Sequence, residues 1–251
     1  MSEHSRSIDL NADLGEGEST DAELLEIVSS CNIACGGHAG DRDSMRATID
    51  AAVARGVAVG AHPSYPDREG FGRRSGFVDA AGLKPALEHQ LADLLYVAAQ
   101  AGEPIRHVKP HGALYNDAAR DRSLADAVAA ALRSLGFDGA LVGPPGSELE
   151  RAATMAGLAF IAEGFVDRAY RADGSLMPRG EPGAVHTDPA VAAQQAVSIA
   201  VDGWVESADG RPVRLPVATL CIHGDTPGAV ASAEAVRTAL ESAGVSIAAR
   251  R

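Results

Sequence analysis

The chain contains 251 residues, with 46% hydrophobic and 22% charged residues, so it is long enough for one large domain or two small ones and can form a core without disulfide or metal staples. Its net charge of −12, without a long basic run, argues against a nucleic-acid-binding or anionic-membrane surface. No window approaches the roughly 18 apolar residues of a membrane span, and the N-terminal sequence is too polar for a signal peptide, so we expect a cytoplasmic protein.

Short β-type runs alternate with longer helical patterns along the whole chain. The predicted strands are 7–13, 31–35, 57–61, 105–109, 139–142, 158–162 and 217–222. The predicted helices cover about 21–29, 42–55, 83–100, 123–135, 147–156, 189–202 and 228–242. Long Gly/Pro-rich loops follow the third and sixth strands, and loops of that length within a compact domain are usually functional.

These elements make about seven βα units. Repeated βα units require right-handed crossovers and a parallel sheet covered by helices, which is either a closed barrel or an open doubly wound sheet. No linker-like segment divides the chain. We therefore predict a single α/β domain over residues 1–251, and the pattern alone leaves the choice between barrel and open sheet undecided.

Polar side chains gather where the predicted strands end, which in parallel α/β proteins is one common face that carries the active site. The candidate site residues are Asn11, Asp13, Glu16, Asn32, His38, Asp41, His62, Arg73, Arg74, Lys109, His111, Tyr115, Glu163, Asp167, Arg168, Arg179, His223 and Asp225. Five of the eight histidines fall in these loops, which predicts a shared polar site. Loop capping or a buried backbone partner explains any single histidine equally well.

Three of these candidates have the ligand types of a divalent metal site. Asp13, His62 and His111 each follow a different strand, and such a set leaves positions open for water and substrate. The same residues also fit metal-free acid–base catalysis, with Asp13 as base and a histidine as proton shuttle. The sequence leaves both interpretations open.

Two other patterns are interpreted as structural. The C-x-x-x-C spacing of Cys31 and Cys35 places both thiols on one face of a strand, which favours a buried pair over a redox or zinc site. The segment LVGPPGSELE resembles a phosphate loop but lacks its Lys-Ser/Thr, so we interpret it as a strand-to-helix turn. No dinucleotide fingerprint is present either, which argues against a nicotinamide or flavin enzyme.

The two long loops concentrate arginine in a protein that is acidic overall. Arg73, Arg74, Arg168, Arg171 and Arg179 all lie there, and guanidinium groups bind carboxylate or phosphate in a bidentate manner. A small anionic substrate follows from this interpretation. Salt bridges to neighbouring acidic residues explain each arginine singly just as well.

Six segments are recognisable together as a family pattern. In chain order they are IDLNADLGEG, CNIACGGHAGD, VGAHPSYPDREGFGRR, HVKPHGALYN, EGFVDRAYRADGSLMPRG and CIHGDTPGAV. They resemble the LamB/YcsF family, the A subunits of 5-oxoprolinase formerly called lactam utilisation proteins, over about residues 8–230. This resemblance implies a single (β/α)7-type barrel related to the glycoside hydrolase/deacetylase superfamily.

The resemblance also implies an activity: ATP-dependent opening of 5-oxoproline (pyroglutamate) to L-glutamate, with release of ADP and phosphate. ATP with Mg would be the cofactor, and the partners would be 5-oxoprolinase subunits B and C. Either the barrel uses an unfamiliar nucleotide site or the partners supply most of it.

Residue type and position after a strand suggest site roles within that activity. The loop arginines would hold the substrate carboxylate or a phosphate, and Lys109 would stabilise developing negative charge. Asp13 with His62 or His111 would activate water. The family's relation to deacetylases, which bind a divalent metal through an aspartate and two histidines, adds weight to these three residues as metal ligands.

Two other functions fit the same residues. One is a metal-dependent carbohydrate deacetylase or amidohydrolase that acts alone, favoured by the implied fold. The other is a non-catalytic binding subunit whose histidines line a ligand pocket while partner subunits perform the chemistry.

Overall fold

The structure is a computed structural model that describes residues 6–250. The described chain forms two compact units: residues 6–12, 20–29 and 163–250 make unit 1, and residues 13–19 and 30–162 make unit 2. Strands β1 (Arg6–Leu14) and β6 (Ala159–Phe165) each contribute residues to both units. That the chain is one domain over residues 1–251 stays a prediction.

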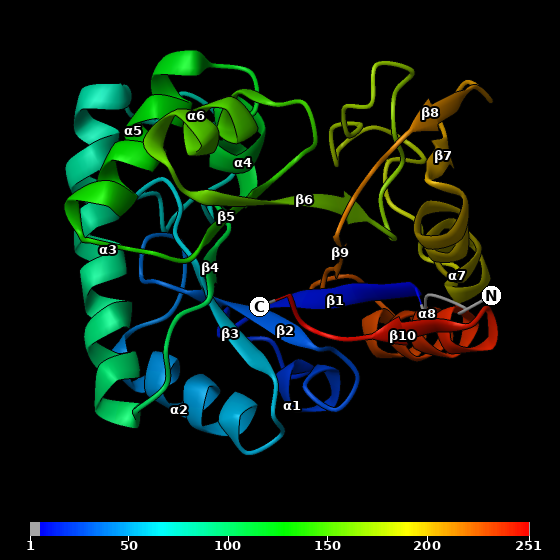
Figure 1. Cartoon of the computed structure of the whole chain (residues 1–251), viewed down its shortest axis with the longest axis horizontal. Helices are drawn as coiled ribbons and strands as arrows, with labels where there is room; N and C mark the ends of the chain where they lie inside the picture. The colour runs from blue at the N-terminus through cyan, green and yellow to red at the C-terminus, as the bar shows by residue number, and fades with distance from the viewer. Residues whose placement is uncertain (1–5, 251) are drawn as a thin grey trace. The chain divides into compact units, whose positions relative to one another are not determined.

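Unit 2 contains the central βα repeats of the chain (Figure 1). Its strands are β2 (Ser30–Ala34), β3 (Ala58–His62), β4 (His107–Val108), β5 (Ala140–Gly143) and the first part of β6. Each strand pairs in parallel with the next. Its helices are α2 (Arg42–Val53), α3 (Ala80–Ala101), α4 (Gly112–Ala118), α5 (Arg122–Ser134) and α6 (Glu148–Ala156).

Helix α3 shows how the sequence sets these elements. The Asp79 side chain accepts a hydrogen bond from the Gly82 amide and caps the first turn, and Gly102 ends the helix in the left-handed region at φ 72°. Between these caps, α3 packs against both α2 and α5 (Figure 1). Strand β2 is buried along its whole length, as expected for a parallel strand covered by helices.

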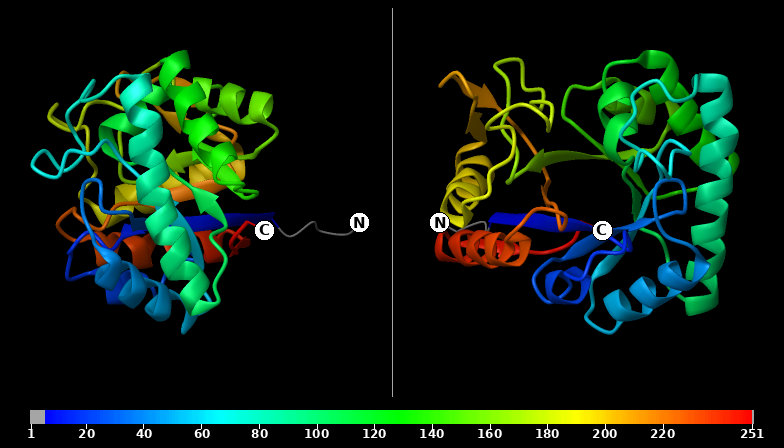
Figure 2. Two further views of the ribbon diagram at one scale, coloured as in Figure 1. Left: turned by 90° about the vertical axis from the view of Figure 1, so that its left-hand side faces the viewer. Right: turned by 180° about the vertical axis from the view of Figure 1, so that it is seen from behind.

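Unit 1 contains the C-terminal elements and most of β1. Its other strands are β9 (Thr219–Ile222), β10 (Val245–Ile247), the end of β6, and the antiparallel hairpin of β7 (Trp204–Glu206) with β8 (Pro212–Arg214). Its helices are α1 (Asp21–Leu24), α7 (Pro189–Val197), the π-helical turn η1 (Ser198–Asp202) and α8 (Ala229–Ser242). Helices α7 and α8 pack against each other, as the right-hand view of Figure 2 shows.

The strand order among residues 6–250 identifies the fold class. The order is β10-β1-β2-β3-β4-β5-β6-β9, and β9 also pairs with β1. The parallel strands β1 to β6 and β9 therefore form a closed seven-stranded barrel sheet, to which β10 adds beside the first residues of β1. The prediction of a (β/α)7-type barrel is confirmed, and the open doubly wound sheet is excluded.

Most predicted elements lie within a few residues of the observed ones, but several details differ. The helix predicted over 21–29 ends at Leu24, because the apolar residues that follow it are buried in turns. The helix predicted over 189–202 changes to π-helical hydrogen bonding after Val197. Helix α4, the β7–β8 hairpin and β10 were not predicted, because each of these elements has seven or fewer residues and therefore shows little periodicity.

The structure agrees with the structural interpretation of the cysteine spacing and of the phosphate-loop-like segment. Cys31 and Cys35 are buried and are not joined in a disulfide, and burial raises the pKa of the Cys35 thiol to about 12. The phosphate-loop-like segment is a turn from β5 into α6, whose first turn is capped by Ser147. Within residues 6–250, none of the helices combines the length and apolar character needed to cross a membrane.

Candidate active site

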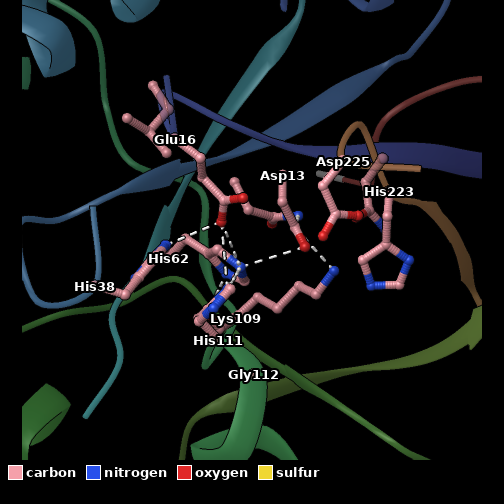
Figure 3. A network of polar contacts seen from close by, with 12 residues as sticks. Asp13, Glu16, His38, His62, Lys109, His111, Gly112, His223 and Asp225 are labelled. Atoms are coloured by element: carbon pink, nitrogen blue, oxygen red, sulfur yellow. Dashed lines mark hydrogen bonds and ion pairs between the residues drawn. The ribbon is translucent and has the colours of Figure 1, made fainter. Parts of the chain in front are cut away.

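Unit 2 brings seven of the predicted site residues into one connected polar network (Figure 3). They are Asp13, Glu16, Asn32, His38, His62, Lys109 and His111. Asp13 lies near the end of β1, His62 ends β3, and Lys109 directly follows β4. These side chains therefore lie at the carboxyl ends of parallel strands, where the order of predicted strands and helices had placed the site.

Asp13 and Lys109 form a buried ion pair in this network. The Lys109 Nζ lies 3.0 Å from Asp13 Oδ1, and the Lys109 residue is only 2% exposed. The Asn32 amide donates a second hydrogen bond to the same oxygen at 2.8 Å. Asn32 is itself held by His107, whose Nε2 lies 2.7 Å from Asn32 Oδ1. Removing one partner of such a pair would be costly because the other charge would stay buried.

A cluster of three histidines and one carboxylate adjoins this pair. The Glu16 Oε1 lies 2.9 Å from His38 Nε2 and 3.3 Å from His111 Nδ1. The His62 Nε2 lies 2.9 Å from His111 Nδ1 and 3.3 Å from Asp13 Oδ2, so His62 joins the cluster to the ion pair. In Figure 3 these ring nitrogens point toward the Glu16 carboxylate.

Burial and mutual contact shift the pKa values in this cluster. Burial raises the pKa of Glu16, but its contacts with His111 and His38 outweigh that effect and hold the pKa well below its usual range. Burial lowers the pKa of His38 to about 4. Burial also lowers the pKa of His111. The cluster therefore favours an ionised Glu16 beside neutral His38 and His111.

A strained loop fixes the orientation of His111. The Phe71 carbonyl lies 3.0 Å from His111 Nε2, and Phe71 has a φ of 52°, a conformation that costs a residue with a side chain on the order of 1–3 kcal/mol. Gly72 follows at φ 64°, and a Cβ there would lie 2.9 Å from His111 Cδ2. Only glycine allows the backbone to approach this ring so closely.

Sequence reasoning missed His107 and Phe71. His107 precedes Lys109 by two residues, so strand periodicity places both side chains on the same face, and this spacing was a usable signal. No sequence signal was available for Phe71, because it contributes a backbone carbonyl.

Unit 1 holds a second group of predicted residues. The His223 Nδ1 lies 2.9 Å from Asp167 Oδ2, and its backbone amide donates to the same carboxylate at 3.2 Å. Burial raises the pKa of Asp167, but the contacts with His223 outweigh it and leave the pKa below its usual value. Arg179 binds Asp225 through both carboxylate oxygens, at 3.1 and 2.9 Å.

Asn11 and Glu163 form a separate contact within unit 1. The Asn11 amide donates to Glu163 Oε1 at 3.0 Å and to Thr219 Oγ1 at 2.7 Å. These bonds connect β1, β6 and β9, so both side chains tie adjoining strands together.

The remaining predicted residues are placed elsewhere or have structural partners. Asp41 caps α2 in a reciprocal capping box with Ser44. Arg74 lies 3.5 Å from Asp67, in agreement with the salt-bridge alternative. Buried Arg168 donates to the carbonyls of Met177 and Ala184 and so holds its own loop together. Burial lowers its pKa to about 10.

Two further predicted residues complete the set. Tyr115 is buried in helix α4, three residues after that helix begins. The Arg73 guanidinium lies 5.0 Å from the centre of the Phe71 ring, in a cation–π arrangement on the loop that orients His111.

Comparison with known proteins places this geometry in a family. The sequence profile of the LamB/YcsF family matches residues 8–251. The chain belongs to this family. The resemblance predicted from the six motifs is therefore confirmed over nearly the whole chain.

Relatives within the LamB/YcsF family have nearly the same length as this chain. The 5-oxoprolinase A subunit from Methylococcus capsulatus is 49% identical over 249 residues, which covers 97% of this chain and 96% of the relative. A protein of the same name from Nocardia farcinica is 49% identical over 243 residues, with 95% and 97% coverage.

Solved structures show the same fold. The crystal structure of a lactam utilization protein from Thermus thermophilus matches with a TM-score of 0.90 and 42% identity, covering 97% of this chain and all of that one. A polysaccharide deacetylase from Bacillus cereus matches with a TM-score of 0.52 and 13% identity, covering 98% and 92%. The second likeness concerns the fold alone.

Proposed function

We propose that this chain is the A subunit of an ATP-dependent 5-oxoprolinase, which opens 5-oxo-L-proline to L-glutamate. The observation that carries the proposal is the 49% identity, over 97% of the chain, to a relative named as the A subunit of 5-oxoprolinase. The buried Asp13–Lys109 pair beside three histidines supports it, because this combination supplies a carboxylate base, a cation and proton carriers at one place.

The overall reaction consumes ATP and two water molecules for each 5-oxoproline and yields glutamate, ADP and phosphate. The lactam is an amide whose carbonyl resists water at neutral pH. Transfer of the γ-phosphoryl group to the lactam oxygen makes that oxygen a leaving group. One water then attacks the ring carbon, and the C–N bond breaks as the nitrogen takes up a proton, which leaves a ring-opened acyl phosphate. The second water hydrolyses this acyl phosphate to the glutamate carboxylate and phosphate.

The residues of this chain have separate roles in that scheme. The Asp13 carboxylate, with His62 3.3 Å away or with His111, activates the attacking water and accepts its proton. The Lys109 ammonium, held beside Asp13, stabilises negative charge that develops on the substrate oxygen. Arg73 or Arg74, which lie in the same unit, binds the substrate carboxylate or a phosphate.

Nucleotide binding involves the partner subunits in this proposal. The relatives' name contains the word subunit, which supports an assembly with other chains, and we propose that these are 5-oxoprolinase subunits B and C acting with ATP and Mg in the cytoplasm. The turn between β5 and α6 lacks the Lys-Ser/Thr of a phosphate loop. Calorimetric titration of the isolated chain with ATP–Mg distinguishes an unfamiliar site on this barrel from a site on its partners.

Substitution of two of the proposed water-activating residues tests the function. In the complex reconstituted with subunits B and C, Asp13→Ala and His111→Ala should each abolish glutamate formation from 5-oxoproline. His89→Ala is the matched control, because the His89 side chain is 82% exposed on α3. Circular dichroism should show that all variants are folded, and near-wild-type turnover by folded Asp13→Ala would contradict the assignment.

A further inference from the structure

Backbone carbonyls fix the tautomers of two histidines in the cluster. The His62 Nδ1 lies 2.8 Å from the Lys109 carbonyl oxygen, and the His111 Nε2 lies 3.0 Å from the Phe71 carbonyl oxygen. A carbonyl oxygen only accepts hydrogen bonds, so the nitrogen that faces it must carry the proton. In neutral imidazoles the opposite nitrogens, His62 Nε2 and His111 Nδ1, are then bare acceptors.

These two bare nitrogens face each other. They lie 2.9 Å apart, which brings two lone pairs into direct opposition unless a positive charge lies between or beside them. The Glu16 Oε1 is 3.3 Å from one and 3.8 Å from the other, and it adds negative charge to the same point. Three acceptors that converge in a buried place require a cation.

His38 takes a different part in the cluster. Its ring is stacked on that of His111, with the centroids 3.7 Å apart and the planes 2° from parallel. A nitrogen lone pair lies in its ring plane, so two parallel, stacked rings cannot both direct lone pairs at one ion. The rings of His62 and His111 are nearly perpendicular, at 88°, and can do so.

The remaining contacts of His38 agree with a positioning role. Its Nε2 lies 2.9 Å from Glu16 Oε1 and donates to it, which holds the carboxylate in place. Its buried Nδ1 has no hydrogen-bond partner within the described part of the chain, as expected if the proton is on Nε2. His38 therefore orients Glu16, as outer residues do around metal ligands.

We propose that His62 Nε2, His111 Nδ1 and Glu16 Oε1 bind a divalent transition-metal ion of the zinc class. Two imidazole nitrogens and one carboxylate oxygen are a donor set that such ions accept, with further positions open. The carbonyl bonds to the far nitrogens of both rings are the outer contacts that metal-bound histidines require.

This donor set differs from Asp13, His62 and His111 in its carboxylate. The ligand atoms of Glu16, His38, His62 and His111 all lie within 4.8 Å of one another. Asp13 directs its Oδ1 to the Lys109 ammonium and the Asn32 amide, and its Oδ2 lies 3.3 Å from His62 Nε2 but is not part of this group of four. A lysine cation on that carboxylate disfavours a metal ion there, so Glu16 takes the place of Asp13. The inference does not rest on lactam opening, because metal binding is measured without substrate.

Calorimetric titration of the chelator-treated full chain with Zn²⁺ tests the site. We expect one equivalent to bind. Glu16→Gln should weaken binding by about tenfold or more, whereas Asp13→Asn should change it by less than about threefold. His89→Ala, an exposed histidine, is the control for weak surface binding. No binding by the wild-type chain beyond that of the doubly substituted His62→Gln/His111→Gln variant would overturn the proposal.

The visible spectrum of the Co²⁺-bound chain supplies a second readout that does not depend on stability. His38→Gln should keep the band positions of the wild type, because His38 is a positioning residue. Glu16→Gln should shift those bands. A shift in His38→Gln, or an unchanged spectrum in Glu16→Gln together with a shift in Asp13→Asn, would contradict the assigned ligands.

Discussion

The buried ion pair of Asp13 and Lys109 gives a quantitative prediction. Lys109→Met keeps most of the side-chain volume but removes the charge whose Nζ lies 3.0 Å from Asp13 Oδ1. Two unit charges about 3 Å apart attract by about 5 kcal/mol at an effective dielectric constant of about 20. Removing one partner of a buried pair costs about 3–5 kcal/mol. We therefore expect Lys109→Met to lower the free energy of unfolding by about 3–5 kcal/mol.

A double-mutant cycle separates this charge effect from loss of packing. The double variant Asp13→Asn/Lys109→Met contains neither charge, so it should be more stable than Lys109→Met alone, with a coupling energy of at least about 2 kcal/mol. Lys84→Met is the matched control: Lys84 pairs with Glu88 on the surface of α3, and its loss should cost less than about 1 kcal/mol.

Urea unfolding followed by circular dichroism measures the stabilities of the wild type, Asp13→Asn, Lys109→Met, the double variant and the Lys84→Met control. The m-values should stay equal between variants, so that midpoints report free energies. If the effects of Asp13→Asn and Lys109→Met add within about 0.5 kcal/mol, the two charges are not coupled and the reasoning fails.

Three further predictions concern stability and reactivity. Gly60→Ala should cost about 1–3 kcal/mol in urea unfolding, because its Cβ would overlap the Nε2 atom of His107; an unchanged midpoint would contradict this packing. Asp167→Asn should lower stability at neutral pH, and its difference from the wild type should shrink as the pH falls below about 4. The stability difference shrinks at low pH because contacts with His223 keep the folded-state pKa of Asp167 below its unfolded value. A stability difference that does not change with pH would contradict this prediction. The three buried thiols should react with Ellman's reagent at pH 8 only after unfolding, and Cys35 should be slow because burial raises its pKa to about 12; rapid native-state labelling would refute this.

The chain pattern predicted about seven βα units and a parallel sheet because alternation of strands and helices is a local property, whereas closure of that sheet into a barrel was implied only by the family resemblance. Strand β3, for example, was predicted within one residue of its observed end at His62. The same pattern placed His62 and Lys109 at strand ends, and so near each other. Elements without clear periodicity, such as helix α4, could not be predicted in this way.

The detailed partners in the site depend on loop geometry that no spacing encodes. Glu16 lies three residues after Asp13, and only the path of the chain after β1 determines which carboxylate reaches the histidines. The tautomer of His111 depends on the carbonyl of Phe71, a residue in a strained conformation on a distant loop. The presence of several arginines in the long loops does not show which of them could bind a substrate. Arg168, for example, holds its own loop together through backbone carbonyls.

Glutamate formation from 5-oxoproline with ATP and Mg is the most direct test of the proposed function. It should be measured with subunits B and C alone, with this chain alone, and with all three chains together. We predict glutamate only when this chain and both partners are present, with one ADP released per glutamate. Equal glutamate formation by subunits B and C without this chain would contradict the central claim.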